Sequence, residues 1–187
     1  YLTESLVPQF NARDKIIKLF DHLASKKIEN PRIIHSFPHL TKSIAAAKES
    51  GSTAAIYASS SHPKHVQSLL TEERRRLDIN SATKLDERVL EGFTLADYIL
   101  YLNEYSKKTF IQHGVPEERL LKVGPLAADL DTYNICPGDH PNEQFVVVSV
   151  ANMNELKGIH YLVKAWKQLE IPDAKLILCG TMNDAVA

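Results

Sequence analysis

The sequence is short of cysteine, of glycine and of long apolar runs. Its two cysteines, Cys136 and Cys179, are far apart and lack a metal-binding or redox spacing, so we expect reduced thiols in a cytosolic protein. None of the seven glycines falls in a Gly-x-Gly-x-x-Gly motif after an expected strand, which argues against a dinucleotide-dependent dehydrogenase. No apolar stretch is long enough to cross a bilayer, and no signal peptide is visible.

An excess of one charge sign is also absent, since 22 basic residues face 23 acidic ones. This balance gives no electrostatic reason to expect nucleic acid as a partner. The basic cluster Arg74–Arg76 follows Glu72 and Glu73, which favours a solvated helix face over a phosphate or anionic-membrane patch. The eight histidines are scattered, and His62 with His65 lacks a third ligand, so we expect no metal site.

Apolar segments and turn residues alternate along the first two thirds of the chain in a strand-and-helix order. Short connections between such elements indicate parallel strands with right-handed crossovers, and therefore an α/β fold. Asn11, Ser61 and Asn103 stand where helices should begin and are suited to cap them. The expected strands are 32–35, 53–58, 97–102 and 120–123, and the expected helices are 11–28, 40–50, one beginning near Pro63, 83–96 and 104–113.

A second strand-loop-helix unit follows at 144–169. The valine-rich run 145–150 is typical of a strand covered on both faces, and the apolar spacing after Gly158 predicts an amphipathic helix. Lys157 and Gly158 stand at the helix entrance, where unpaired N–H groups and the helix dipole favour an anion. A further buried strand is expected at 174–179, running into Gly180.

Between these two parts, residues 125–143 are rich in proline and aspartate and show little periodicity. We therefore expect an N-terminal domain at 1–124, an interdomain linker at 125–143 and the start of a C-terminal domain at 144–187. The chain begins with Tyr1 rather than methionine and stops shortly after a core strand, so we expect a piece of a longer protein.

Three segments together resemble the retaining glycosyltransferases of the two-domain GT-B architecture, most closely those of family 4. They are EGFTLADYILYL with the following NEYSKKTFIQHGVPEERLLKVGPLAADLDTY, then VVVSVANMNELKGIHYLVKAW, then AKLILCG. A weaker similarity lies in SSSHPKHVQSLLTEERRRL. The resemblance implies an α/β fold of the GT-B type with two Rossmann-like parallel domains, both incomplete in this chain. It also implies retaining transfer of a sugar from a nucleotide-diphospho-sugar, in the synthesis of cell-surface polysaccharide or glycolipid.

The resemblance further implies roles for individual residues. The family holds the donor diphosphate with a lysine and an arginine in this loop; Lys157 matches, whereas Asn152 occupies the arginine position. His62 matches a position near the reacting sugar and is the expected catalytic residue, although a solvated loop histidine is the alternative. The implied donor-binding residues are Asn152, Met153, Asn154, Lys157, Gly158 and Gly180, and the implied acceptor-side residues are His35, Ser36, Ser61 and Asn103.

Structural explanations compete for several of these residues. His35 suits a satisfied structural histidine, Asn103 a helix cap, and Gly180 a simple strand-to-loop turn. Glu87 and Glu91 share one helix face, but Lys84 and Arg88 nearby favour a solvated face over a catalytic carboxylate pair.

The implied partners are a nucleotide-sugar donor and a sugar, polysaccharide or lipid-linked acceptor, with no cofactor and no metal. A cytoplasmic enzyme of this kind can associate peripherally with the inner face of the cell membrane. The family's second acidic motif would lie beyond Ala187, so we expect this piece alone to be inactive. Two alternatives stay open: a non-catalytic assembly partner, suggested by Asn152, and a GT-B sugar-nucleotide epimerase.

Overall fold

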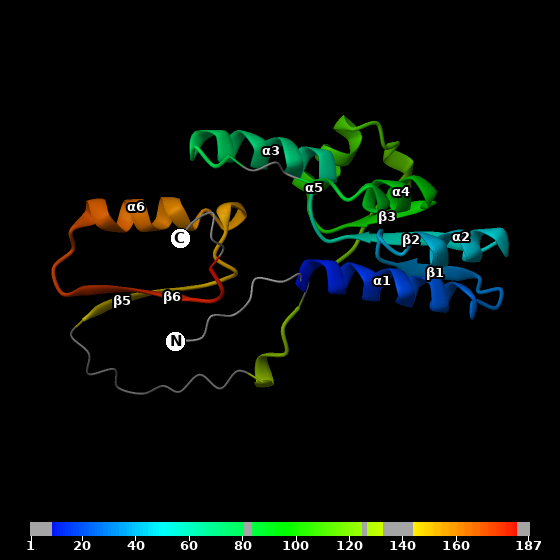
Figure 1. Cartoon of the computed structure of the whole chain (residues 1–187), viewed down its shortest axis with the longest axis horizontal. Coiled ribbons are helices and arrows are strands. Elements are labelled where there is room, and N and C mark those ends of the chain that lie inside the picture. Colours follow the sequence, from blue (N-terminus) through cyan, green and yellow to red (C-terminus); the bar gives the residue numbers. More distant parts are fainter. Residues whose placement is uncertain (1–8, 81–83, 125–126, 133–143, 183–187) are drawn as a thin grey trace. The chain divides into compact units, whose positions relative to one another are not determined.

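The computed structural model describes residues 9–80, 84–124, 127–132 and 144–182 (Figure 1). Its contacts divide the chain into two compact units. The first unit comprises 1–67 and 84–125, and the second comprises 68–83 and 126–187. The predicted division is linear, whereas the contacts group 68–83 with the second unit. Most of the predicted linker lies outside the described residues; its described part, 127–132, contains the short 3-10 helix Leu130–Thr132.

The first unit is built on a parallel sheet with the strand order β1-β2-β3-β4. The strands are β1 (Ile33–Ser36), β2 (Thr53–Ala58), β3 (Tyr98–Tyr101) and β4 (Leu120–Lys122), and Figure 1 shows the first three side by side. The helices are α1 (Gln9–Ser25), α2 (Thr41–Glu49), α3 (Pro63–Arg76), whose second half belongs to the second unit, α4 (Glu87–Leu95) and α5 (Glu104–Gln112). The predicted parallel α/β fold is thereby confirmed.

Alternate residues of these strands form the core of the first unit. Ile56 pairs in register with Ile99, and the side chains of both are fully buried. Because side chains alternate across a strand, every second residue joins this layer. Helices α2, α4 and α5 contribute Ile44, Phe93 and Phe110 to the same cluster.

The connection between α1 and α2 depends on one buried carboxylate. Asp21 of α1 is 4% exposed and accepts hydrogen bonds from the N–H groups of Lys42 (2.9 Å) and Ser43 (2.9 Å). These are amides of the first turn of α2, whose own N-cap residue, Leu40, supplies no side-chain bond. Asp21 therefore caps a helix that the local sequence leaves uncapped.

Two helix starts differ from the sequence-based expectation. Helix α1 already includes Gln9, so Asn11 lies inside the helix rather than at its start. Helix α4 begins at Glu87 rather than near residue 83, because the Asp86 side chain accepts a hydrogen bond from the Arg88 N–H. The predicted cap of α5 is confirmed, since Asn103 Oδ1 accepts from the Ser106 N–H at 2.9 Å.

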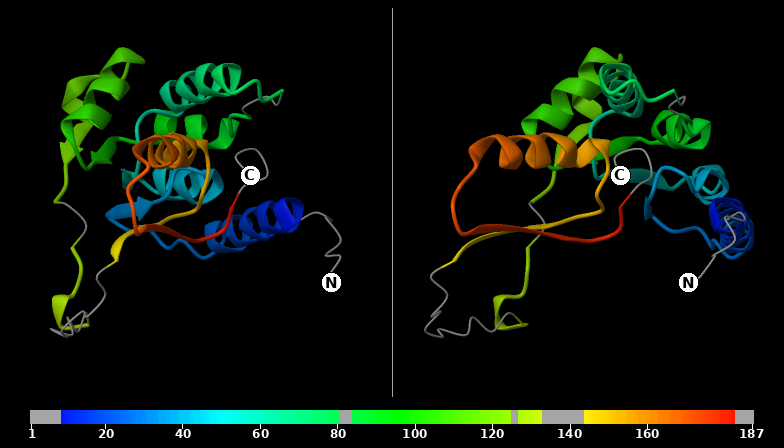
Figure 2. Two further views of the ribbon diagram at one scale, coloured as in Figure 1. Left: turned by 90° about the vertical axis from the view of Figure 1, so that its left-hand side faces the viewer. Right: turned by 60° about the vertical axis from the view of Figure 1, so that its left-hand side comes forward.

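The second unit contains the parallel pair β5 (Phe145–Val150) and β6 (Ala174–Cys179) and the helix α6 (Ile159–Leu169). Figure 2 shows α6 lying along one side of this pair. The prediction that β5 is covered on both faces is wrong for the described residues, because Val148 is 55% and Val150 77% exposed. A two-stranded sheet with one helix covers less surface than the apolar sequence anticipates.

Two further expectations concern the whole chain. No helix within the described ranges is both long and apolar enough to span a bilayer. Cys179 is a free, exposed cysteine, whereas Cys136 lies outside the described residues.

Candidate functional site

The loop between β5 and α6 is held by the segment that follows β6. The Ala151 N–H donates to the Cys179 carbonyl (3.0 Å), and the Met153 N–H donates to the Thr181 carbonyl (2.7 Å). These bonds continue the parallel pairing past the ends of both strands. The loop therefore stands at the carboxyl edge of the β5–β6 pair, where parallel sheets bind their ligands.

A tight turn then directs the chain into α6. Residues Glu155–Lys157 form a 3-10 helix, and the Asn154 side chain accepts a hydrogen bond from the Lys157 N–H at 3.2 Å. Gly158 follows with φ +64°, a left-handed conformation that only glycine adopts at little cost. The backbone conformation therefore favours glycine at this position.

The entrance of α6 presents groups suited to an anion. In the described part of the chain, the N–H groups of Ile159 and His160 have no carbonyl acceptor, and the Tyr161 N–H is the first to bond, to the Gly158 carbonyl. Lys157 is exposed on the preceding turn, and none of the described carboxylates forms an ion pair with it. An ammonium beside free amides at a helix start is the arrangement that binds phosphate groups.

The remaining predicted donor-binding residues serve the structure of the loop. Asn152 is exposed, and its Oδ1 accepts a hydrogen bond from Thr181 Oγ1 at 3.1 Å. Met153 is 1% exposed, so its side chain is part of the packed interior beneath the loop. A Cβ on Gly180 would lie 1.8 Å from the Ala151 carbonyl oxygen, so close backbone approach explains this glycine. Their donor-binding roles stay predictions.

A buried ion pair that sequence reasoning missed supports the turn. The Glu155 side chain is 3% exposed, and its Oε1 accepts hydrogen bonds from Arg74 Nε (2.6 Å) and from the adjacent guanidinium nitrogen. Burial raises the pKa of Glu155, but a backbone N–H and Arg74 outweigh it, so the pKa lies below its usual value. The basic cluster is therefore not uniformly solvated, because Arg74 is engaged in this pair.

A second set of polar contacts links α3 to the start of α6. Glu73 Oε1 lies 2.8 Å from His160 Nε2, and Glu73 also binds the Tyr161 hydroxyl, which lowers the Glu73 pKa. Arg76 adds an ion pair to Glu72. Of these residues, all but His160 border a cavity of about 420 Å³, which is lined by Leu69, Leu70, Glu72, Glu73, Arg76, Glu155, Leu156, Lys157, Gly158 and Tyr161. The side chain of Lys157 thus stands beside a sizeable opening.

In the first unit, His62 is not the solvated loop residue of the alternative interpretation. It is 6% exposed and occupies the N-cap position of α3, where its Nδ1 accepts a hydrogen bond from the Lys64 N–H at 3.3 Å. The prediction that Ser61 is the cap is therefore wrong. Burial, followed by the nearby charges of His113, Lys64 and His65, lowers the pKa of His62 to about 4. The imidazole is neutral at neutral pH, with its proton on Nε2.

The predicted acceptor-side residues lie along the carboxyl edge of the first sheet. Ser36 ends β1, and the exposed His35 precedes it with its ring 6.3 Å from that of Tyr57. Asn103 follows β3 and caps α5, so the structural explanation of this residue holds. Glu87 and Glu91 are both exposed, as predicted for a solvated helix face.

No protein-family model matches the sequence, and no curated protein matches it. Several solved structures match the chain at low sequence identity. Anabaena Alr3699/HepE in complex with UDP superimposes with a TM-score of 0.59 at 18% identity, covering 91% of this chain and 44% of that one. The same protein with UDP and glucose gives a TM-score of 0.60 at 16% identity, covering 97% and 47%.

The chain has a Rossmann-like α/β fold of the GT-B type. It spans less than half the length of the HepE chain with which it aligns. A UDP-N-acetylglucosamine 2-epimerase from Rickettsia bellii aligns with a TM-score of 0.39 at 15% identity, over 95% of this chain and 53% of that one.

Proposed function

We propose that this GT-B chain is part of a glycosyltransferase that moves a sugar from a nucleotide-diphospho-sugar to an acceptor. The observation that carries the proposal is the entrance of α6, where the exposed Lys157 precedes two N–H groups, those of Ile159 and His160, that have no carbonyl acceptor among the described residues. This entrance lies at the carboxyl edge of a parallel pair. HepE, which has the same fold, was solved with UDP and with UDP-glucose, and this supports a nucleotide sugar as the anion.

In this proposal the diphosphate of the donor lies at the turn Lys157–Gly158. As the bond from the sugar to the diphosphate breaks, negative charge grows on the departing phosphate oxygen. The Lys157 ammonium and the N–H groups of Ile159 and His160 stabilise that charge without a metal ion. Gly158 lets the phosphate approach the backbone, because no side chain stands in the way.

The proposal also covers the stereochemistry of the transfer, the acceptor and the cellular location of the reaction. The resemblance to family 4 supports transfer with retention, with His62 near the reacting sugar. A neutral His62 can donate a hydrogen bond from Nε2 to a sugar hydroxyl. We assign the reaction to polysaccharide or glycolipid synthesis in the cytoplasm, at the inner face of the cell membrane.

Isothermal titration of the full-length protein with UDP, UDP-sugars and GDP-sugars tests the donor site. A charge-assisted hydrogen bond contributes about 1.5–3 kcal/mol, so Lys157→Ala should weaken binding by roughly one to two powers of ten. The matched control is Lys175→Ala, an exposed lysine near the amino end of β6, opposite the loop. Equal affinity in Lys157→Ala and Lys175→Ala, or no binding of any nucleotide sugar, would refute the assignment.

A non-catalytic assembly partner is the second candidate, because Asn152 replaces the family's arginine and its side chain is bonded to Thr181. Product analysis separates the candidates. Free nucleotide together with a glycosylated acceptor identifies a transferase, an altered sugar nucleotide identifies an epimerase, and donor binding without turnover identifies the assembly partner.

A further inference from the structure

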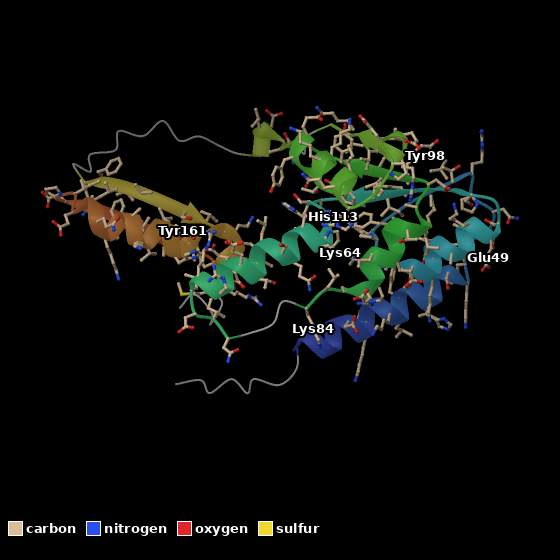
Figure 3. All side chains as sticks on the ribbon, turned by 90° about the horizontal axis from the view of Figure 1, so that it is seen from above. Glu49, Lys64, Lys84, Tyr98, His113 and Tyr161 are labelled. Carbon is tan, nitrogen blue, oxygen red and sulfur yellow. The ribbon has the colours of Figure 1, made fainter. Side chains whose placement is uncertain are left out.

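Four aromatic rings gather where the start of α3 meets α5. His62 and His65 come from the start of α3, Tyr105 from the first turn of α5, and His113 from its end. Tyr105 and His113 are eight residues apart, so they share one face of α5. Figure 3 labels His113 beside Lys64 at this crossing.

The rings form a connected set. His62 stacks on His113 with 4.3 Å between centroids and 12° between planes. The ring of His65 meets His113 edge-on at 6.2 Å and Tyr105 edge-on at 5.7 Å. A 2.7 Å hydrogen bond between His65 Nε2 and the Tyr105 hydroxyl fixes the outer pair. Each ring is thus oriented by at least one other.

The outer rings of this set are open to solvent. Tyr105 is 57% exposed, His113 is exposed and His65 is half-buried, whereas His62 lies beneath them. His113 Nδ1 lies 2.8 Å from the Thr109 carbonyl, which can only accept, so Nδ1 carries the proton. In the neutral ring, Nε2 of His113 is therefore free to accept a hydrogen bond. The exposed ammonium of Lys64 adds donors nearby.

This chemistry fits the face of a sugar ring. A pyranose has one face of C–H groups, which packs against the electron-rich face of an aromatic ring, and a rim of hydroxyls that needs donors and acceptors. A metal ion fits less well, because none of the histidine, cysteine, aspartate and glutamate groups in the described ranges forms a metal-binding cluster. We propose that Tyr105, His65 and His113 form a stacking platform for a pyranose ring. The identification of that sugar as the acceptor substrate rests on the proposed function.

Saturation-transfer NMR of the full-length protein with methyl β-D-glucopyranoside and methyl β-D-galactopyranoside tests the platform, with uridine as a competing stacking ligand. We expect transfer to the C–H protons of at least one glycoside. Because an aromatic contact contributes about 0.5–1.5 kcal/mol, Tyr105→Ala should raise the Kd roughly 2- to 12-fold. Tyr105→Phe, which keeps the ring, should retain most of the affinity. Tyr98→Ala removes an exposed tyrosine, 38%, from the amino end of β3 and should leave glycoside binding unchanged.

The proposal is overturned if neither glycoside receives saturation, if Tyr105→Ala binds like the unaltered protein, or if only uridine binds through Tyr105. Donor titrations in the same variants keep this result separate from the proposed function. Tyr105→Ala should leave the Kd for UDP unchanged, and Lys157→Ala should leave glycoside binding unchanged. If the protein binds a glycoside but binds no nucleotide sugar, the stacking platform is supported and the proposed transferase function is refuted.

Discussion

Removal of Arg74 should destabilise the second unit more than removal of any exposed charge. Arg74→Met keeps most of the side-chain volume but leaves the Glu155 carboxylate, 3% exposed, without its cation. Breaking a buried ion pair costs about 3–5 kcal/mol, and the 19% exposure of the Arg74 side chain places the loss near the lower end, at about 3 kcal/mol. Loss of both partners should cost less, because no unpaired charge is then buried. Arg74→Met/Glu155→Met is therefore expected to be more stable than Arg74→Met alone.

The effect should depend on pH with a definite sign. In the unaltered protein the pKa of Glu155 is lowered, so the stability it contributes is present above the pKa of the unfolded chain and is lost as the pH falls through the folded pKa. In Arg74→Met the burial remains and the cation is gone, so that pKa should rise above its usual value. The deficit of the variant should then be largest at neutral pH and should shrink in acid.

Trp166, the single tryptophan, lies on α6 and reports on the second unit directly. Urea unfolding followed by its fluorescence should show a lower midpoint for Arg74→Met, with an unchanged slope. Arg75→Met is the matched control, because Arg75 is the exposed neighbour on the same helix. Equal midpoints for the two single variants, or a double variant less stable than Arg74→Met, would show that the pair does not carry the stability assigned to it.

Three other changes give separate tests. Asp21→Ala removes the acceptor for two α2 amides and should lower the stability of the first unit by about 1–3 kcal/mol, measured by hydrogen exchange of α2, whereas Asp21→Asn should lose less. His62 should titrate near pH 4 by NMR, and its contribution to stability, full above about pH 6.5, should disappear as the pH falls toward 4; a value near 6.5 contradicts its burial. Gly180→Ala should displace the loop because its Cβ would lie 1.8 Å from the Ala151 oxygen, and unchanged UDP binding and stability would contradict that packing.

Local signals in the sequence predicted the elements that depend on local chemistry. Helix α5 begins where Asn103 can cap it, and Gly158 stands where the chain needs a left-handed residue. The apolar segment 53–58 predicted strand β2, and its register with β3 buries Ile56 against Ile99. In each case the residue type acts on backbone within a few positions, so a single stretch of sequence holds the information.

The predictions of helix caps failed where a residue far away in the sequence supplies or fixes the cap that a neighbouring residue was expected to form. Ser61 is a good cap by type, yet the cap of α3 is a histidine whose backbone N–H is held by Thr109, 47 residues away. Helix α2 takes its cap from Asp21, on another helix. Helix α1 has helical apolar spacing, but Phe20 is 58% exposed, so periodicity predicted the helix without predicting what covers it.

The loop between β5 and α6 contains both residues that could be recognised from the sequence and contacts that could not. Its lysine and glycine could be recognised from the sequence, because an anion site at a helix start needs only a charge, a turn and free amides in order. The ion pair that supports the loop could not be recognised from the sequence, because Arg74 and Glu155 are 81 residues apart in the chain. Glu155 lies two residues before Lys157, and the 3-10 turn that contains both is fixed by that buried pair. The position of Lys157 therefore depends on α3. A substitution of Arg74 should weaken donor binding even though Arg74 does not contact the donor in this proposal.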